Sequence, residues 1–293
     1  MPSAEGLDNP RALEILSTTL GGLYVAWNAT NTQFATVPSD GCPASRDDGW
    51  LAAADPRWAR HEGTGAGLDA VQVIDAAAQH VLGLTSYAQN RMRAVIVWPV
   101  VRAVNEHIAH AAWLLEPGIT PQARMARRWM ARLAAAHRYR WAAGARKVTS
   151  RQLRDAKKCR EAIRGEFLDR FPGADTQWTD PAREPVPSWT IEGERYPNLS
   201  QQNRLIEKLG VKNYAGLYDA LSLYAHPNSV TLTMQIDRND TGGSVQVTYP
   251  LNLEQWDSAV RAVTTLLGAG AYAACNYFAL DTAHLDAWCD NTF

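Results

Sequence analysis

Six polar side chains on two predicted helices could form one chemical centre. They are Arg102, Glu106 and His110 in residues 98–117, and Tyr218, Ser222 and His226 in residues 214–228. Within each set the residues recur every four positions, a step that drifts only about 40° around a helix, so each set shares one face. The neighbouring faces are apolar, and buried charges must be paired. We therefore expect the two helices to face each other, with the six side chains in one buried network.

The predicted network has two interpretations. If it is reactive, the expected roles are anion binding by Arg102, orientation by Glu106, acid or base action by His226 or His110, and supporting hydrogen bonds from Ser222 and Tyr218. If it is structural, Arg102 and Glu106 form an ordinary ion pair one helical turn apart, and the other members satisfy it across the interface. A small-molecule enzyme with its pocket at this network is a further alternative.

Metal ligation is not expected from these residues. Glu106, His107 and His110 lie on one helix, and no second helix carries the acidic and histidine residues that would complete a two-metal site. The four cysteines are scattered along the chain without a CxxC pair, as is typical of free thiols in a reducing cytoplasm. We therefore expect neither a metal nor another cofactor.

A short pattern on the first helix resembles a ribonuclease motif. Arg102 and His107 fit the R-x4-6-H pattern of the HEPN superfamily of small helical domains, and Arg132 and His137 fit it as well. The resemblance implies metal-independent RNA cleavage, in which the arginine holds the phosphate and the histidine transfers a proton. A five-residue step, however, puts two side chains about 140° apart on a straight helix.

The two helices together are similar to a bacterial, largely actinobacterial, family of uncharacterised helical proteins. The matching patterns are R-x3-E at residues 102–106 and Y-x2-L-S-x3-H at residues 218–226. The resemblance covers about residues 86–228, roughly half of the chain. It implies a HEPN-like helical fold and the same polar cluster.

A strongly basic segment lies beside this cluster in the sequence. The chain has a net charge of −1, yet residues 121–165 contain fourteen Lys and Arg against two acidic residues, with Trp129, Tyr139 and Trp141 interleaved. Phosphate contacts and base stacking require this combination. The candidate nucleic-acid contacts are Arg124, Arg127, Arg128, Arg132, Lys157 and Lys158. We expect RNA or another polyanion as partner, in a stress or phage-defence setting. Alternatively, the basic segment meets the acidic remainder of its own fold or of a second subunit, or its basic face docks an acidic partner.

The periodicity predicts a mainly α fold, a bundle of about eight helices with one β-hairpin before the last helix. The predicted helices are residues 8–28, 68–84, 86–115 with a kink at Pro99, 120–145, 149–171, 198–209, 214–225 and 253–277. We expect one domain over residues 1–293, an irregular arm or lid at 32–67 and the hairpin at 229–249, with its turn at 238–243.

The location of the protein is predicted from the lack of a signal peptide and of a membrane-spanning segment in the sequence. The first residues lack the basic and apolar run of a signal peptide. The longest apolar segment, residues 266–280, falls short of the roughly 20 residues that a membrane span needs. We therefore expect a cytoplasmic protein without membrane contact.

Overall fold

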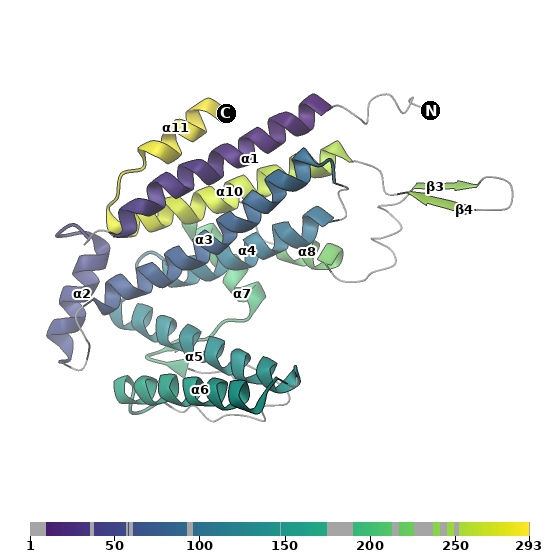
Figure 1. Cartoon of the computed structure of the whole chain (residues 1–293). Helices are drawn as coiled ribbons and strands as arrows, with labels where there is room; N and C mark the ends of the chain where they lie inside the picture. Colours follow the sequence, from purple (N-terminus) through teal and green to yellow (C-terminus); the bar gives the residue numbers. More distant parts are fainter. Residues whose placement is uncertain are drawn as a thin grey trace. The chain divides into compact units, whose positions relative to one another are not determined.

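The computed structural model of the chain is mainly helical (Figure 1). It describes residues 10–35, 38–56, 58, 61–92, 96–146, 148–174, 190–212, 217–225, 237–240, 245–248 and 252–292. The chain forms two compact units: unit 1 comprises residues 1–38, 70–116 and 199–293, and unit 2 comprises residues 39–69 and 117–198. The single domain expected over residues 1–293 stays a prediction; the chain leaves unit 1 and returns to it twice, and each unit contains buried apolar side chains of its own.

Unit 1 contains most of the long helices. Its elements are α1 (Pro10–Asn31), η2 (Thr32–Ala35), residues 70–89 of α3 (Glu62–Gln89), α4 (Val97–Leu114), α7 (Leu199–Arg204), η4 (Leu205–Leu209), α8 (Leu217–Ala225), β3 (Asp237–Asp240), β4 (Val245–Thr248), α10 (Leu253–Phe278) and α11 (Ala283–Thr292).

Helix α4 lies at the centre of unit 1, in contact with α7, α8 and α10 (Figure 1). The apolar stripe predicted from the sequence is its core face, since Val101, Val104 and Ile108 are each 0% exposed. Helix α10 comes close to this face at Gly270, where an added Cβ would lie 2.9 Å from Cδ1 of Ile108. Only a residue without a side chain permits this approach of the two helices without displacing Ile108.

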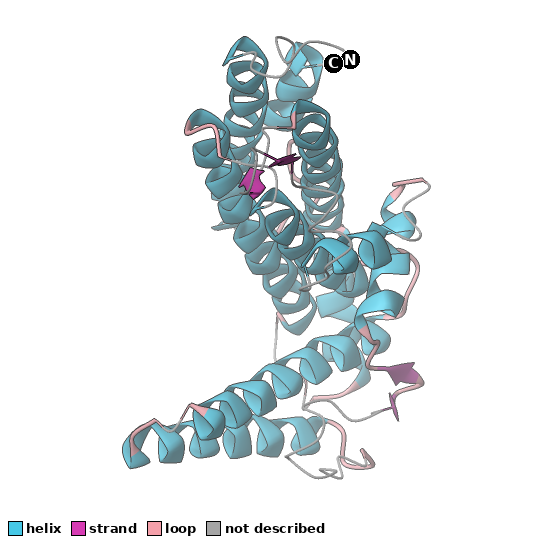
Figure 2. Cartoon of the chain, turned by 90° about the vertical axis from the view of Figure 1, so that its right-hand side faces the viewer, coloured by secondary structure: helices cyan, strands magenta, loops and turns pink. Residues whose placement is uncertain are grey.

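Unit 2 contains α2 (Pro43–Ala54), residues 62–69 of α3, α5 (Pro121–Ala145), α6 (Ser150–Arg170), β1 (Thr190–Ile191) and β2 (Glu194–Arg195). Helices α5 and α6 pack side by side as a helical hairpin (Figure 2). Both begin where their capping residues predicted. The hydroxyl of Thr120 accepts a hydrogen bond from the backbone of Ala123 at 3.2 Å, and Thr149 forms a capping box with Gln152.

The number of helices and the position of the hairpin before the last helix were predicted wrongly. Ten α-helices lie in the part of the chain that the structure describes, where about eight were expected, and the β3–β4 hairpin is followed by two helices rather than one. The sequence missed α11 because this short helix buries only Leu285 and lacks an apolar stripe.

The predicted helix over residues 86–115 is in fact two helices, since α3 ends at Gln89 and α4 begins at Val97. Pro99 is the third residue of α4, where a backbone N–H has no partner within the helix, so the proline opens the helix without kinking it. The stretch 32–67 also differs from the predicted irregular arm, because it holds η2, α2 and the first turns of α3.

The hairpin is displaced along the chain relative to its prediction. Strands β3 and β4 are antiparallel, with Asp237 opposite Thr248 and Asp240 opposite Val245. Residues 238–240, predicted as part of the turn, therefore lie in a strand, whereas residues 229–236 and 249 fall outside the described residues. Of the helices that the structure describes, none has the length and apolar character needed to cross a membrane.

Candidate functional site

The polar faces of α4 and α8 meet, as the sequence predicted, through three residues. The Nε atom of Arg102 donates a hydrogen bond to Glu106 at 2.8 Å, and its Nη2 atom donates to the hydroxyl of Tyr218 at 3.2 Å. The guanidinium carbon also lies 5.3 Å from the centre of the Tyr218 ring. One cation is thus bound by a carboxylate on its own helix and by a phenol on the neighbouring helix.

This cluster lies at the edge of unit 1 rather than in its interior, which corrects the prediction of a buried network. The side chains of Arg102 and Glu106 are 17% and 32% exposed. Partial burial works against the charge of Arg102, but the hydrogen bonds and charges of Glu106 and Tyr218 outweigh it and raise the pKa of Arg102 above its ordinary value. The guanidinium remains cationic at every physiological pH and is reachable by an anion.

Of the other three predicted members, Ser222 and His110 lie among the described residues. Ser222 is half-buried on α8 and makes no hydrogen bond with any other described residue. The ring of His110 packs against Trp113, with the centroids 5.7 Å apart. His226 lies outside the described residues. The structure therefore joins three of the six predicted residues, Arg102, Glu106 and Tyr218, and Arg102 is a phosphate-binding type of side chain.

The two R-x4-H pairs point their side chains in different directions. Arg102 faces α8, whereas the ring of His107 lies 5.3 Å from that of His80 on α3. Burial, together with the neighbouring His107, lowers the pKa of His80. In the second pair, Arg132 stacks over the ring of Trp129 at 4.6 Å, and His137 is only 2% exposed. Neither pair holds an arginine and a histidine over one shared phosphate position.

Half of the candidate nucleic-acid residues form internal ion pairs of unit 2. The pairs are Arg124 with Asp47 at 2.9 Å, Arg127 with Glu194 at 2.7 Å, and Arg128 with Glu62 and with Asp69 at 2.9 Å. Arg124 and Arg127 are each 6% exposed. Their charges are therefore neutralised within the unit and are not presented to a ligand.

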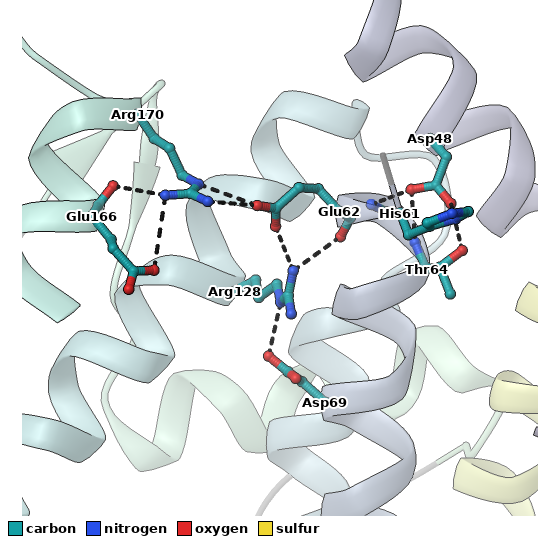
Figure 3. Close-up of polar contacts among 9 residues, drawn as sticks. Asp48, His61, Glu62, Thr64, Asp69, Arg128, Glu166 and Arg170 are labelled. Carbon is teal, nitrogen blue, oxygen red and sulfur yellow. Dashed lines mark hydrogen bonds and ion pairs between the residues drawn. The ribbon is translucent and has the colours of Figure 1, made fainter. Parts of the chain in front are cut away.

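Glu62, the first residue of α3, holds the largest of these networks together (Figure 3). One carboxylate oxygen accepts from Arg128, and the other accepts from Arg170 at 3.0 Å. Glu62 is 6% exposed, so its buried negative charge is stabilised by the two guanidinium groups, and it balances their positive charge in turn. At Gly65, one turn along α3, an added Cβ would overlap the guanidinium of Arg128.

Asp48 fixes the start of α3 from α2. Its carboxylate accepts hydrogen bonds from the backbone N–H groups of Gly63 at 2.6 Å and Thr64 at 3.1 Å (Figure 3). These two donors belong to the first turn of α3 and have no acceptor within the helix, so a carboxylate from another helix serves as their cap. Helix α2 and the start of α3 thus supply the carboxylates that hold two arginines of α5, and Gly65 leaves room for one of them, Arg128.

The far part of the α5–α6 hairpin carries basic groups of a different kind. Between residues 131 and 160 there are ten Lys and Arg and one acidic residue, Asp155. We define the hairpin surface by the exposed members of this segment and its exposed aromatic residues: Arg138, Tyr139, Trp141, Arg146, Arg151, Arg154, Lys157 and Lys158. Tyr139 is 57% exposed and Trp141 is 48% exposed. The two rings thus add exposed aromatic surface to a segment rich in basic side chains.

The positive charge of this region also affects a buried histidine. His137 lies on α5 next to the hairpin surface and is 2% exposed. Burial and the cationic groups of Arg160, Arg138 and Arg140 lower the pKa of His137. Its imidazole is therefore neutral at neutral pH, and the charge of the hairpin surface comes from its lysines and arginines.

The chain was also compared with known proteins. No protein-family model, curated protein or solved structure matches it.

Proposed function

We propose that the protein binds single-stranded RNA through the hairpin surface of α5 and α6. The observation that carries this proposal is the exposure of Tyr139 and Trp141, at 57% and 48%, among basic side chains. Lysines and arginines alone would suit any polyanion. Exposed aromatic rings add stacking on bases, a contribution worth about 1–3 kcal/mol per base.

The charges of the two units support this assignment. Unit 2 contains 20 Lys and Arg against 15 Asp and Glu, whereas unit 1 contains 9 against 15. The described acids of unit 2 that form its buried ion pairs neutralise Arg124, Arg127 and Arg128 and leave the hairpin surface as the basic excess. A phosphate backbone would follow this surface because each neutralised phosphate releases counterions.

Cleavage of the bound RNA is not part of this proposal. Arg102 of the α4–α8 cluster could hold a phosphate, but a general acid or base must stand within hydrogen-bond reach of the reacting atoms. Among the described residues, the histidines of the R-x4-H pairs face away from their arginines. The pocket of about 490 Å³ in unit 2, which includes Trp58, Arg170 and Phe171, contains none of the six predicted cluster residues.

Fluorescence anisotropy with a labelled single-stranded RNA of about 20 nucleotides tests the proposal. We expect saturable binding that weakens with rising salt. Trp141→Ala should raise Kd by on the order of tenfold or more, because one stacking contact is lost. Trp50→Ala is the matched control, since Trp50 is 41% exposed on α2, outside the hairpin surface. Equal effects of the two substitutions, or no binding, would overturn the proposal.

An acidic protein partner is the competing function, and polyglutamate of equal charge distinguishes it. Polyglutamate has no bases to stack, so RNA should bind more tightly at the same salt concentration, and Trp141→Ala should affect only RNA. Equal affinities and no effect of Trp141→Ala on either ligand would favour the protein partner.

A further inference from the structure

Two histidines that are far apart in the sequence lie next to each other in unit 1. His80 is on α3 and His107 is on α4, and their ring centroids are 5.3 Å apart with the planes at 58°. Both side chains are half-buried, so water and small ions reach them. Neither residue belongs to the α4–α8 cluster or to the hairpin surface.

The ring of His107 has one nitrogen fixed and one nitrogen left for a ligand. Its Nδ1 atom lies 2.6 Å from the backbone oxygen of Ala103, and because a carbonyl oxygen only accepts, Nδ1 carries the hydrogen. In the neutral ring, the lone pair is then on Nε2. Histidines that bind metals typically donate their second N–H to a carbonyl or carboxylate in this way.

The ring of His80 is not held by any hydrogen bond with another described residue. The separation of the two rings also suits a shared ion. With metal–nitrogen bonds of roughly 2.0–2.1 Å and a tetrahedral angle, two imidazole centroids lie roughly 5 Å apart. The observed centroid separation of 5.3 Å matches this spacing.

We infer that His80 and His107 together bind one divalent transition metal ion, such as Zn²⁺ or Cu²⁺, between α3 and α4. No group of three or more histidine, cysteine or carboxylate ligands was found within the described ranges, so water completes the coordination. Imidazole suits these ions better than Mg²⁺ or Ca²⁺, and Cu²⁺ binds most tightly to a given nitrogen site. The site goes beyond RNA binding and does not depend on it.

Titration of the untagged full chain with Cu²⁺, followed by electron paramagnetic resonance and calorimetry, tests the site. We expect one equivalent to bind with nitrogen couplings from two imidazoles. His80→Gln and His107→Gln should each leave one coupled imidazole and raise Kd at least about tenfold. His284→Ala, which removes an exposed histidine of α11, is the control and should change neither readout.

Several results would overturn the inference. These are the absence of saturable binding, a wild-type spectrum with fewer than two imidazoles, or a spectrum that changes in only one of the two glutamine variants. The melting temperature of each metal-free variant shows whether the fold is intact. If either variant does not fold, the number of imidazoles coupled in the wild-type spectrum decides the question alone.

Discussion

The α5–α6 hairpin has two parts in which basic residues differ. The near part, residues 121–130, has its arginines in ion pairs, whereas the far part, residues 131–160, exposes lysines and arginines to solvent. In the near part, Arg124, Arg127 and Arg128 are paired with carboxylates and largely removed from water. In the far part, the lysines and arginines of the hairpin surface are exposed, as are Tyr139 and Trp141. The difference lies in the partners, because α2, β2 and the start of α3 supply acids only to the near part. A basic stretch of sequence is therefore not evidence of a basic surface until the acidic residues that pair with it have been located in the structure.

The largest loss of stability is expected from Glu62→Gln. The substitution removes the buried carboxylate that Arg128 and Arg170 share. Both arginines are only partly buried and Arg128 keeps its ion pair with Asp69, so the free energy of unfolding should fall by up to about 3 kcal/mol. Urea denaturation measures this. Asp155→Asn is the control, because its ion pair with Arg151 spans 3.9 Å between exposed side chains and should contribute under about 1 kcal/mol. Equal losses would show that the near part is no more dependent on its ion pairs than the surface.

Gly65→Ala should cause the second largest loss of stability. The new Cβ would overlap the Arg128 guanidinium, and shifting this group should cost roughly 1–3 kcal/mol of stability. Gly83→Ala in the same helix has open space around it and should be neutral or stabilising by up to about 1 kcal/mol, because alanine favours helix. Thermal unfolding of the two variants would contradict the account if Gly65→Ala were the more stable one.

These glycines illustrate what the sequence could and could not predict. Helices α5 and α6 were placed correctly because Thr120 and Thr149 are local capping signals, and the meeting of α4 and α8 followed from the four-residue spacing of Arg102 and Glu106. The start of α3 was assigned to an irregular region because its glycines are poor helix formers.

Pairing of the basic segment with acids of its own fold was one of the alternatives, but the individual partners of α5 could not be predicted because they are remote in sequence. Arg128 and Glu62 are 66 positions apart, and Arg124 and Asp47 are 77 apart. No local pattern connects such residues. The only available signal was the spacing of Arg124 and Arg128, which places them beside the apolar residues Met125 and Trp129 on the buried part of α5.

A double substitution of Lys157→Ala and Lys158→Ala should affect RNA binding without affecting the fold. Both residues are exposed, so the free energy of unfolding should change by less than about 0.5 kcal/mol. The slope of log K against log salt should become shallower by about 1.4, since each phosphate contact to a single strand contributes about 0.7. Lys208→Ala, which removes a cation 61% exposed in unit 1, should leave the slope unchanged.

The last prediction concerns the pH dependence of stability. Burial, with Arg160, Arg138 and Arg140 nearby, lowers the pKa of His137 in the folded state. Below the ordinary histidine pKa of about 6.5, the unfolded chain therefore binds a proton that the folded chain excludes, and stability falls as the pH falls toward the folded pKa.

His137→Gln should remove this single-proton dependence, which amounts to at most about 1.4 kcal/mol per pH unit. Denaturation at pH 7.5, 6.5 and 5.5 would show the wild-type chain losing more stability than the variant. Parallel losses in the two proteins would mean that the pKa of His137 is not lowered by folding.

Photo-crosslinking of single-stranded RNA containing 4-thiouridine, with the linked residues identified by mass spectrometry, tests the central contrast most directly. The account predicts crosslinks at Tyr139 or Trp141 and none within residues 121–130, where the arginines are already paired. Crosslinks concentrated in residues 121–130, or found only outside the α5–α6 hairpin, would contradict it.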